Sequence, residues 1–321
     1  HTPLPWINYL GSNDFFSLIS NTCGGYSFYK DAKLLRITRY RYNNIPADSN
    51  GKYYYINDDG VIWNPGTMPS ATETDTYECR HGLGYSRFCS SKNNLKAELL
   101  VFVPSDASCE INCLKLKNNS ETEKNISLFS YVEFCLWNAV DDASNFQRNL
   151  SIGEGEVQGS TIYHKTENRE RRKHYSFFTV NTQVDNYDTN RDAFLGAGNG
   201  NAFPEAVCKK KCSNSIASGW YPIAAHQIDL TLLPGEEKEF VFMLGYCENP
   251  ADDKWEAPGI INKTSAKALI ERFNTMEKAM QAFAELKNYW ETLLARFAVV
   301  SEHEHIDRMA NIWNQYPCMV T

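Results

Sequence analysis

Alternation of apolar and polar residues is the main pattern along the first four-fifths of the chain. In one run, Leu128, Val132 and Phe134 fall on one face of a strand. Phe129 and Tyr131 in the same run fall on the other face. Successive side chains of a strand point to opposite faces of its sheet. The run is therefore predicted to be a strand with apolar side chains on both faces.

A second alternating pattern lies near residue 235 and predicts a β-hairpin with a loop somewhat longer than minimal. Its residues are Ile228, Leu230 and Leu232 before Pro234-Gly235, and Phe240, Phe242 and Leu244 after it. Many such runs follow one another with no helical pattern between them. Together they predict a mainly β protein built on a large antiparallel β-sandwich.

The pattern changes after residue 260 from alternation to helical spacing. Apolar residues now recur every three or four positions, which predicts an amphipathic helix. They are Ala279, Phe283, Leu286, Trp290, Leu293 and Phe297. Asn274 with Glu277, and Ser301 with Glu304, have the spacing of a capping box. Each pair is therefore expected to start a helix.

The second helix is predicted to carry a further apolar stripe, and Pro317 is expected to break or kink it. The stripe consists of Ile306, Met309, Ile312, Trp313 and Tyr316. A terminal segment this apolar is normally buried, so we expect the chain to be the front part of a larger protein. The predicted divisions are a β-sandwich domain over 1–260, a helical linker over 261–300 and the start of a helical domain over 301–321.

Charge and composition exclude some classes of function. The formal net charge is −7, which argues against a nucleic-acid partner because phosphate binding needs an excess of Lys and Arg. No stretch approaches the roughly 20 apolar residues of a membrane span. The ten cysteines include no C-x-x-C pair. Buried thiols in a reducing cytoplasm are favoured over a zinc site, and no metal site is expected.

The best candidate for a ligand-binding segment is 137–150, which follows the strong strand described above. It combines Trp137 with Asn, Asp, Gln and Arg side chains, which hydrogen-bond sugar hydroxyls. Polar groups on a loop above a rigid sheet are a usual place for a binding site. Asp141 and Asp142 are adjacent, so on a strand they would point apart and make a poor acid-base pair.

Other stretches leave two interpretations open. The basic and aromatic run 36–44 suits a sugar site or a subunit interface about equally. The run 78–86 contains Gly-x-Gly but lacks a third glycine and a following helix, so His81 is expected to be a hydrogen-bonded strand or turn residue. The charged run 169–174 is expected to be a solvated surface, with a phosphate site as the alternative. The glycine pair after Cys23 favours a turn over the wall of a ligand site.

Several short sequence segments, in this order along the chain, resemble those of the cellobiose phosphorylases. These enzymes belong to glycoside hydrolase family ninety-four, formerly glycosyltransferase family thirty-six. The matching words are TPLPWINYLG (2–11), CGGY (23–26), RITRYRYNN (36–44), CRHGLGY (79–85), FCLWNA (134–139), NFQRN (145–149) and NIWNQY (311–316). The resemblance runs over essentially the whole chain. One departure is Pro317, where the family pattern leads us to expect Gln.

The resemblance implies a galactose-mutarotase-like sandwich, a two-helix linker and then an (α/α)6 barrel. It also implies an inverting phosphorolysis of cellobiose to α-glucose 1-phosphate and glucose, with inorganic phosphate as a substrate and no cofactor. The catalytic Asp and the phosphate ligands are expected on the barrel, so these residues alone should be inactive. A cytoplasmic homodimer is implied as well.

Site residues can be transferred only in part. Arg148 resembles the family's contact to the acceptor glucose, reaching the site by way of the dimer, and Gln147, Asn149 and Trp137 are expected to bind substrate beside it. One alternative is a standalone, non-catalytic sugar-binding module. The other is the same part of a cellodextrin or laminaribiose phosphorylase.

Overall fold

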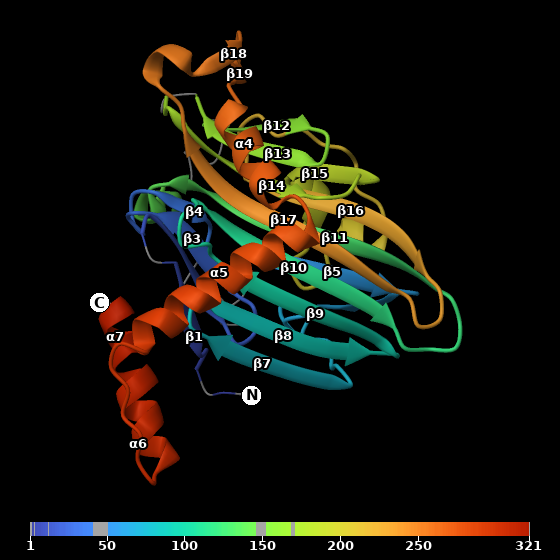
Figure 1. The fold of residues 1–321 in the computed structure, drawn as a ribbon. Helices are drawn as coiled ribbons and strands as arrows, with labels where there is room; N and C mark the ends of the chain where they lie inside the picture. Colours follow the sequence, from blue (N-terminus) through green and yellow to red (C-terminus); the bar gives the residue numbers. More distant parts are fainter. Residues whose placement is uncertain are drawn as a thin grey trace.

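The computed structural model describes residues 2, 4–11, 13–40, 51–145, 152–167 and 171–320. Two antiparallel sheets pack face to face (Figure 1). The first sheet has the order β1 (Ile7–Leu10), β2 (Phe15–Ser20), β3 (Gly25–Tyr29), β4 (Arg36–Thr38), β11 (Lys124–Trp137), β16 (Pro222–Leu232) and β15 (Asn186–Asn190). Two further strands join it, because β5 (Lys52–Asp58) pairs with β11 and with β6 (Val61–Trp63).

The second sheet has eight strands among the described residues. Its order is β12 (Gly153–Gln158), β13 (Thr161–Thr166), β14 (His174–Val180), β17 (Glu237–Glu248), β10 (Cys109–Asn118), β9 (Leu95–Phe102), β8 (Tyr85–Lys92) and β7 (Thr76–Gly82). A small hairpin of β18 (Trp255–Ala257) and β19 (Ile260–Ile261) stands at the β12 end. The predicted antiparallel β-sandwich is confirmed.

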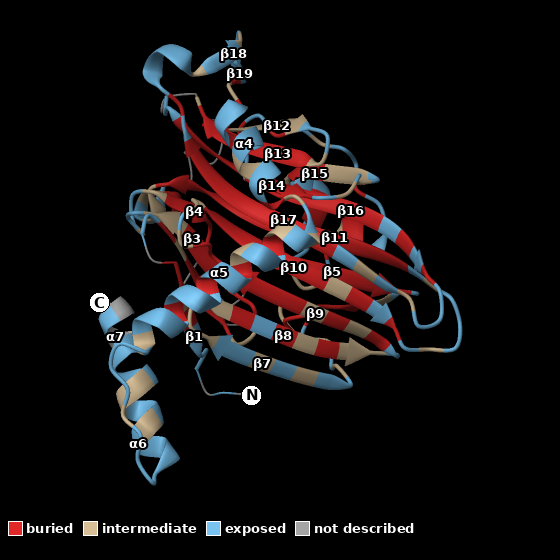
Figure 2. Ribbon diagram, in the orientation of Figure 1, coloured by how far each residue is buried: buried red, intermediate tan, exposed pale blue. Residues whose placement is uncertain are grey.

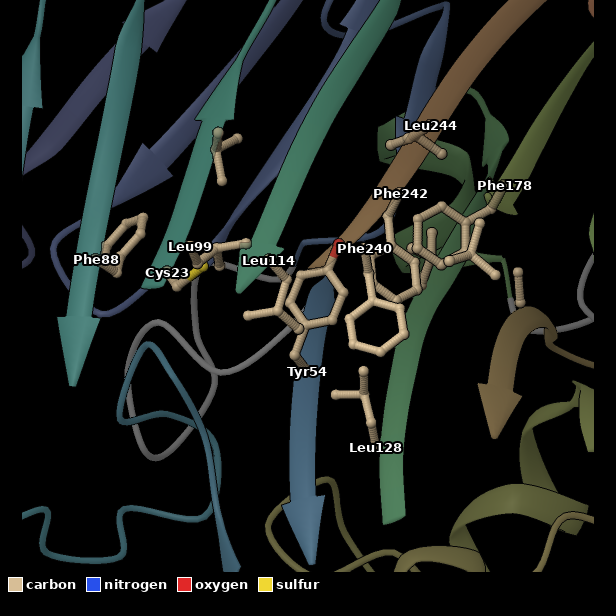
Figure 3. Close-up of a cluster of buried hydrophobic side chains, with 14 of the residues drawn as sticks. Cys23, Tyr54, Phe88, Leu99, Leu114, Leu128, Phe178, Phe240, Phe242 and Leu244 are labelled. Carbon is tan, nitrogen blue, oxygen red and sulfur yellow. The ribbon is translucent and has the colours of Figure 1, made fainter. Parts of the chain in front are cut away.

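The main core lies between the two sheets, where strands of both carry buried side chains (Figure 2). Large rings from different strands meet there, among them Tyr54, Phe178 and Phe242 (Figure 3). A second core lies on the outer face of the second sheet, beneath two long helices. A third lies on the outer face of the first sheet, beneath α2 (Arg191–Leu195) and α3 (Glu205–Cys208).

The predicted alternation in β11 is confirmed. Leu128, Val132 and Phe134 lie in the core between the sheets. Phe129 and Tyr131 lie in the core on the outer face, against α2. Because both faces of this long strand are buried, it is a central element of the sandwich.

The predicted hairpin at residue 235 is wrong. β16 pairs with β11 and β15 in the first sheet, whereas β17 pairs with β10 and β14 in the second. The Pro234-Gly235 turn therefore carries the chain from one sheet to the other. Alternation shows that each strand buries one face, but two strands that face each other across a core alternate in the same way as two strands of one hairpin.

One ion pair crosses the core between the sheets. Lys52 of β5 pairs with Glu110 of β10, whose side chain has no exposed surface. Ser17 and Ser27 of the first sheet also donate to this carboxylate. Burial would raise the pKa of Glu110, but the Lys52 charge and these hydrogen bonds lower it below the ordinary value. The carboxylate is therefore held charged inside an apolar layer.

Two helices cover the second sheet, and α5 runs diagonally across β17 and β10 (Figure 1). They are α4 (Thr264–Phe273) and α5 (Met276–Leu294). The predicted stripe is buried at Ala279, Phe283, Leu286 and Trp290, whereas Leu293 and Phe297 are 37% and 64% exposed.

The predicted helix starts are displaced. Thr275 caps α5 by accepting from Lys278 N, and Asn274 instead ends α4. Ser301 accepts from His303 N ahead of α6 (Glu304–Arg308), whose N-cap is His303. In each case a neighbouring residue with extended backbone takes the cap position.

The chain after α6 does not form one continuous helix. A π-helical turn (Met309–Trp313) separates α6 from α7 (Gln315–Val320). The predicted break therefore falls just before Pro317, which lies in the first turn of α7, where a missing backbone N–H is tolerated. The Tyr316 hydroxyl reaches back to β1, donating to Asn8 Oδ1 at 3.1 Å and accepting from Tyr9 N at 3.1 Å.

Within the described part of the chain, no helix is long and apolar enough to cross a membrane. The same residues contain no group of three or more His, Cys, Asp or Glu side chains arranged to hold a metal ion. The ten cysteines are free thiols, and six of them are buried.

Shortening a buried residue of α5 should loosen the helix from its sheet. Leu286 is 3% exposed, and Leu286→Ala is expected to lower the free energy of unfolding by about 2–5 kcal/mol, because it leaves a cavity over the sheet. Met280 on the same helix is 36% exposed, and Met280→Ala should cost less than about 1 kcal/mol. Denaturant titration measures both, and equal losses would contradict the packing described above.

Candidate functional site

A buried guanidinium lies at the end of the sandwich where the predicted binding segment begins. Arg39, just after β4, is 1% exposed. Its Nε and Nη2 both donate to the Asp142 carboxylate at 2.6 Å, and its Nη1 donates to Glu133 Oε1 at 2.9 Å. Parallel donation of this kind fixes the direction as well as the position of the carboxylate. The two carboxylates and the guanidinium therefore form one rigid unit.

Further groups complete the surroundings of Glu133. Arg191, the first residue of α2, places its Nε 3.4 Å from Glu133 Oε1, and the Tyr131 hydroxyl donates to Oε2 at 2.9 Å. The ring of Tyr221 lies 5.1 Å from the Arg39 guanidinium and 5.7 Å from that of Arg191. Two cations thus face two carboxylates and an aromatic ring, so the buried charges are matched.

These contacts keep the charges permanent. Burial alone would lower the pKa of Arg39, but the charges of Asp142 and Glu133 outweigh it and raise the pKa above its ordinary value. The pKa of Arg191 is also raised, because the charge of Glu133 outweighs the cost of burial. Neither guanidinium can exchange a proton, so the cluster is a framework and not an acid-base pair.

The framework joins described residues that flank two segments of interest. Arg39 N donates to the Glu133 carbonyl at 2.8 Å, and Glu133 N donates to the Gly51 carbonyl at 2.9 Å. Residues on both sides of 41–50 are therefore bound to one residue of β11. Asp142, gripped by the same arginine, belongs to α1 (Ala139–Ser144), which ends shortly before 146–151. The bases of the predicted segments 36–44 and 137–150 are thus brought together.

The helix α1 was not expected from the sequence, although its residues were singled out. Asn138 caps it by accepting from Asp141 N at 3.1 Å. Asp142 points inward to Arg39, and its Oδ1 also accepts from Leu136 N at 3.1 Å. The argument that Asp141 and Asp142 would point apart on a strand is wrong, because both lie in α1, and Asp142 is bound by Arg39.

The predicted substrate-binding residues Gln147, Arg148 and Asn149 lie outside the described residues. Their roles stay predictions. Trp137, the fourth predicted residue, ends β11 with φ +64° and is 1% exposed. Its Nε1 donates to Thr166 Oγ1 at 3.1 Å, and its ring packs edge-on against His174 at 4.3 Å. It lies in the core between the sheets, and its contact with a sugar also stays a prediction.

Sequence reasoning did not identify the framework residues as partners. Arg39 was considered only as part of the basic and aromatic run 36–44, and Asp142 only as a candidate catalytic acid. A signal was nevertheless present, because Glu133 interrupts the apolar run of a strand buried on both faces. A carboxylate at such a position needs a buried cation. Arg191 had no comparable signal.

A buried histidine lies beside the framework. His164 of β13 has no exposed surface, and it stacks on Phe134 at 4.7 Å and on Trp137 at 5.7 Å. Burial, with the nearby charge of Arg39, lowers the pKa of His164 to about 3. The imidazole is therefore neutral at ordinary pH and serves the packing of the core.

The other stretches highlighted in the sequence have structural explanations. His81 Nδ1 lies 2.8 Å from Ser86 Oγ across the β7–β8 hairpin, which confirms a hydrogen-bonded strand residue. Gly84 has φ +75°, and a Cβ there would lie 2.7 Å from Trp290 Nε1. The positive φ of the turn and the close approach of α5 therefore explain this glycine without a bound phosphate. Cys23-Gly24 forms the turn between β2 and β3, as favoured from the sequence.

Comparison with known proteins adds a family to this geometry. Residues 1–276 match the family described as glycosyl hydrolase 94, supersandwich domain. The chain is 33% identical over 319 residues to an N,N'-diacetylchitobiose phosphorylase of Vibrio furnissii. It is 26% identical over 318 residues to a 3-O-beta-D-glucopyranosyl-beta-D-glucuronide phosphorylase of Paenibacillus borealis.

These two alignments cover 98% and 97% of this chain but only 38% of each relative. The chain thus spans less than half the length of the curated relatives it matches. Among solved structures, a bacterial glucoamylase complexed with acarbose matches with a TM-score of 0.53 at 11% identity, over 91% of this chain and 39% of that one. A likeness at this level of identity concerns the fold alone.

Removing the buried guanidinium should destabilise the protein strongly. Arg39→Met is expected to lower the free energy of unfolding by about 3–5 kcal/mol, because Asp142 and Glu133 lose their shared cation while still buried. Arg80, whose side chain is 72% exposed beside Glu78, supplies the control Arg80→Met, which should leave the unfolding midpoint nearly unchanged. A small effect of Arg39→Met would show that the framework is dispensable.

Acid should destabilise the fold through His164. The folded protein keeps this imidazole neutral down to about pH 3, whereas the unfolded chain takes up a proton below about pH 6.5. The unfolded state therefore binds more protons between these values, and stability falls as the pH falls. His164→Phe should reduce that slope by up to about 1.4 kcal/mol per pH unit.

Unfolding titrations between pH 6.5 and 5 test this slope. The exposed residue His305 offers the control His305→Phe, whose surroundings change little on unfolding. If both variants keep the slope of the unchanged protein, the buried neutral state of His164 is refuted.

Proposed function

Because the chain belongs to the glycosyl hydrolase 94 family through its supersandwich domain, we propose that it is the N-terminal sandwich and linker of an inverting cellobiose phosphorylase. The reaction is cellobiose plus inorganic phosphate to α-glucose 1-phosphate plus glucose. A phosphate oxygen attacks the anomeric carbon directly, and a general acid protonates the leaving oxygen. The general acid and the phosphate ligands belong to the remainder of the enzyme.

The match of residues 1–276 to the supersandwich domain carries this proposal, and the framework around Arg39 supports the location of the binding segment. The framework holds α1 through the buried bidentate contact of Arg39 with Asp142, and the backbone N–H of Glu133 in β11 holds Gly51 at the start of β5. The segment 145–149, which contains Arg148, follows α1 directly in the sequence. A binding residue held on a rigid support loses little entropy when it meets its ligand. Arg148, with Gln147, Asn149 and Trp137, is proposed to bind the acceptor glucose.

Two observations support a larger enzyme. The chain spans only 38% of the length of two phosphorylases that it matches, and it has an exposed apolar face. Ile306, Met309, Ile312 and Trp313 are each between 46% and 56% exposed. Apolar surface of this kind usually marks a contact with another domain or protein. A helical (α/α)6 domain is the proposed partner of this face. A homodimer in the cytoplasm, with no cofactor, completes the proposal.

A second substrate is favoured by a specific observation. The chain is 33% and 34% identical to N,N'-diacetylchitobiose phosphorylases of Vibrio furnissii and Vibrio proteolyticus over 98% of its length. N,N'-diacetylchitobiose is therefore the alternative to cellobiose, ahead of longer cellodextrins and laminaribiose. A standalone sugar-binding module is the non-enzymatic alternative.

Phosphorolysis by the full-length protein tests the proposal. We expect phosphate-dependent release of glucose from cellobiose and much slower cleavage of N,N'-diacetylchitobiose. The reverse preference would change the substrate and keep the reaction class. Activity that does not depend on phosphate, or none with either sugar, would overturn the proposed reaction.

Arg148→Ala in the full-length protein tests the site. The Michaelis constant for glucose in the synthetic direction should rise about 30- to 800-fold, the equivalent of about 2–4 kcal/mol for a desolvated Arg contact. The unfolding midpoint should stay within error of the unchanged protein. Arg80→Ala is the matched control, and an unchanged Michaelis constant in Arg148→Ala would remove this residue from the site.

A further inference from the structure

A hollow of about 720 Å³ lies at the opposite edge of the second sheet from β7. Its walls come from β12 and β13, from residues 171–173, and from the β18–β19 hairpin that projects at this end (Figure 1). The volume is within the range of small-molecule sites, about 300–1,000 Å³. None of its residues takes part in the framework around Arg39.

Charge is the first unusual property of this hollow. Among the described residues, five cationic side chains and two carboxylates line it, which gives these residues a formal charge of +3. The whole chain carries −7. A concave surface of one sign concentrates ligands of the opposite sign. The hollow therefore suits an anion, although the protein as a whole repels anions.

The inner wall of the hollow is built from paired charges, of which Lys165 is the most deeply buried. The Lys165 side chain is 2% exposed and lies 2.8 Å from Glu156 Oε1 and 3.3 Å from Glu154 Oε2. Lys254 pairs with Glu167. These pairs fix the shape of the inner wall. The remaining cations that line the hollow lie at its mouth.

Three consecutive cations form that mouth. Arg171, Arg172 and Lys173 are exposed and line the hollow. Lys173 lies 3.5 Å from Glu248. Arg171 has no ion-pair partner among the described residues. Arginine presents several N–H donors in one plane, which match two oxygens of a phosphate.

An aromatic wall is the second unusual property. Trp255 of β18 is 38% exposed and lines the hollow. The ammonium groups of Lys254 and Lys165 lie 4.5 and 4.9 Å from its ring centroid and hold the indole in place. An inorganic phosphate ion would use neither this ring nor most of the volume. The C–H face of a pyranose packs well on an indole.

From this combination of a cationic mouth, a fixed indole and a roomy hollow, we infer that the hollow binds a sugar phosphate. The phosphate lies at Arg171 and Arg172, and the sugar ring lies toward Trp255. The charged run 169–174, expected from the sequence to be a solvated surface, thus contributes its described residues 171–173 to a ligand site. This inference does not depend on the proposed phosphorylase reaction, because it concerns binding by the sandwich itself.

Calorimetric titration of the 321-residue chain tests the inference. α-Glucose 1-phosphate should bind in a saturable way, inorganic phosphate at least about tenfold more weakly, and glucose without measurable heat at the same concentrations. Equal affinity for inorganic phosphate and the sugar phosphate would overturn the inference, since the sugar would then add nothing. Absence of saturable binding would overturn it as well.

Two sets of variants locate the site. The double variant Arg171→Gln and Arg172→Gln should weaken sugar phosphate binding at least about tenfold. Trp255→Ala should weaken the sugar phosphate but leave inorganic phosphate unchanged. Arg80→Gln, at the other edge of the same sheet, is the control, and unfolding midpoints verify that each variant is folded. Undiminished binding in the folded double variant would place the ligand elsewhere and refute the assignment.

Discussion

The bidentate contact between Arg39 and Asp142 is the interaction on which the functional end of this molecule depends. Both side chains are buried, so each would be very unfavourable without the other. The same guanidinium holds Glu133, and the backbone of Glu133 holds the residues that flank 41–50. The Arg39 cation and the backbone of Glu133 thus connect β4, β5, β11 and α1. Loss of that charge would disturb all four elements together, which is why they behave as one support.

Much of the fold could be predicted from the sequence, because burial leaves a periodic pattern. The two faces of β11, the sandwich itself and the buried part of α5 follow from alternation and helical spacing. Pairing did not follow: β16 and β17 alternate like a hairpin yet belong to different sheets. Periodicity reports which face of an element is buried and is silent about which neighbour buries it. The helix caps are displaced for a different reason, because several neighbouring polar residues suit one cap position.

The candidate site was predicted only by region. The segment 137–150 and the run 36–44 were both singled out, and the structure brings their bases together through Arg39. The contact itself joins residues 103 positions apart, and nothing local in the sequence encodes it. Arg148 and its neighbours were assigned from the resemblance to a family and not from physical chemistry. Their assignment therefore rests on kinship, whereas that of the framework rests on geometry.

The Lys52–Glu110 pair has a consequence for how this sandwich can change over time. Contacts between apolar side chains allow one sheet to slide over the other, but an ion pair between the sheets permits a single alignment. If either partner were replaced alone, the other would be left as an unpaired charge in the apolar core. Descendants of this sequence should accordingly keep both residues or lose both together, and a swap to two aliphatic residues would trade a unique alignment for a looser interior.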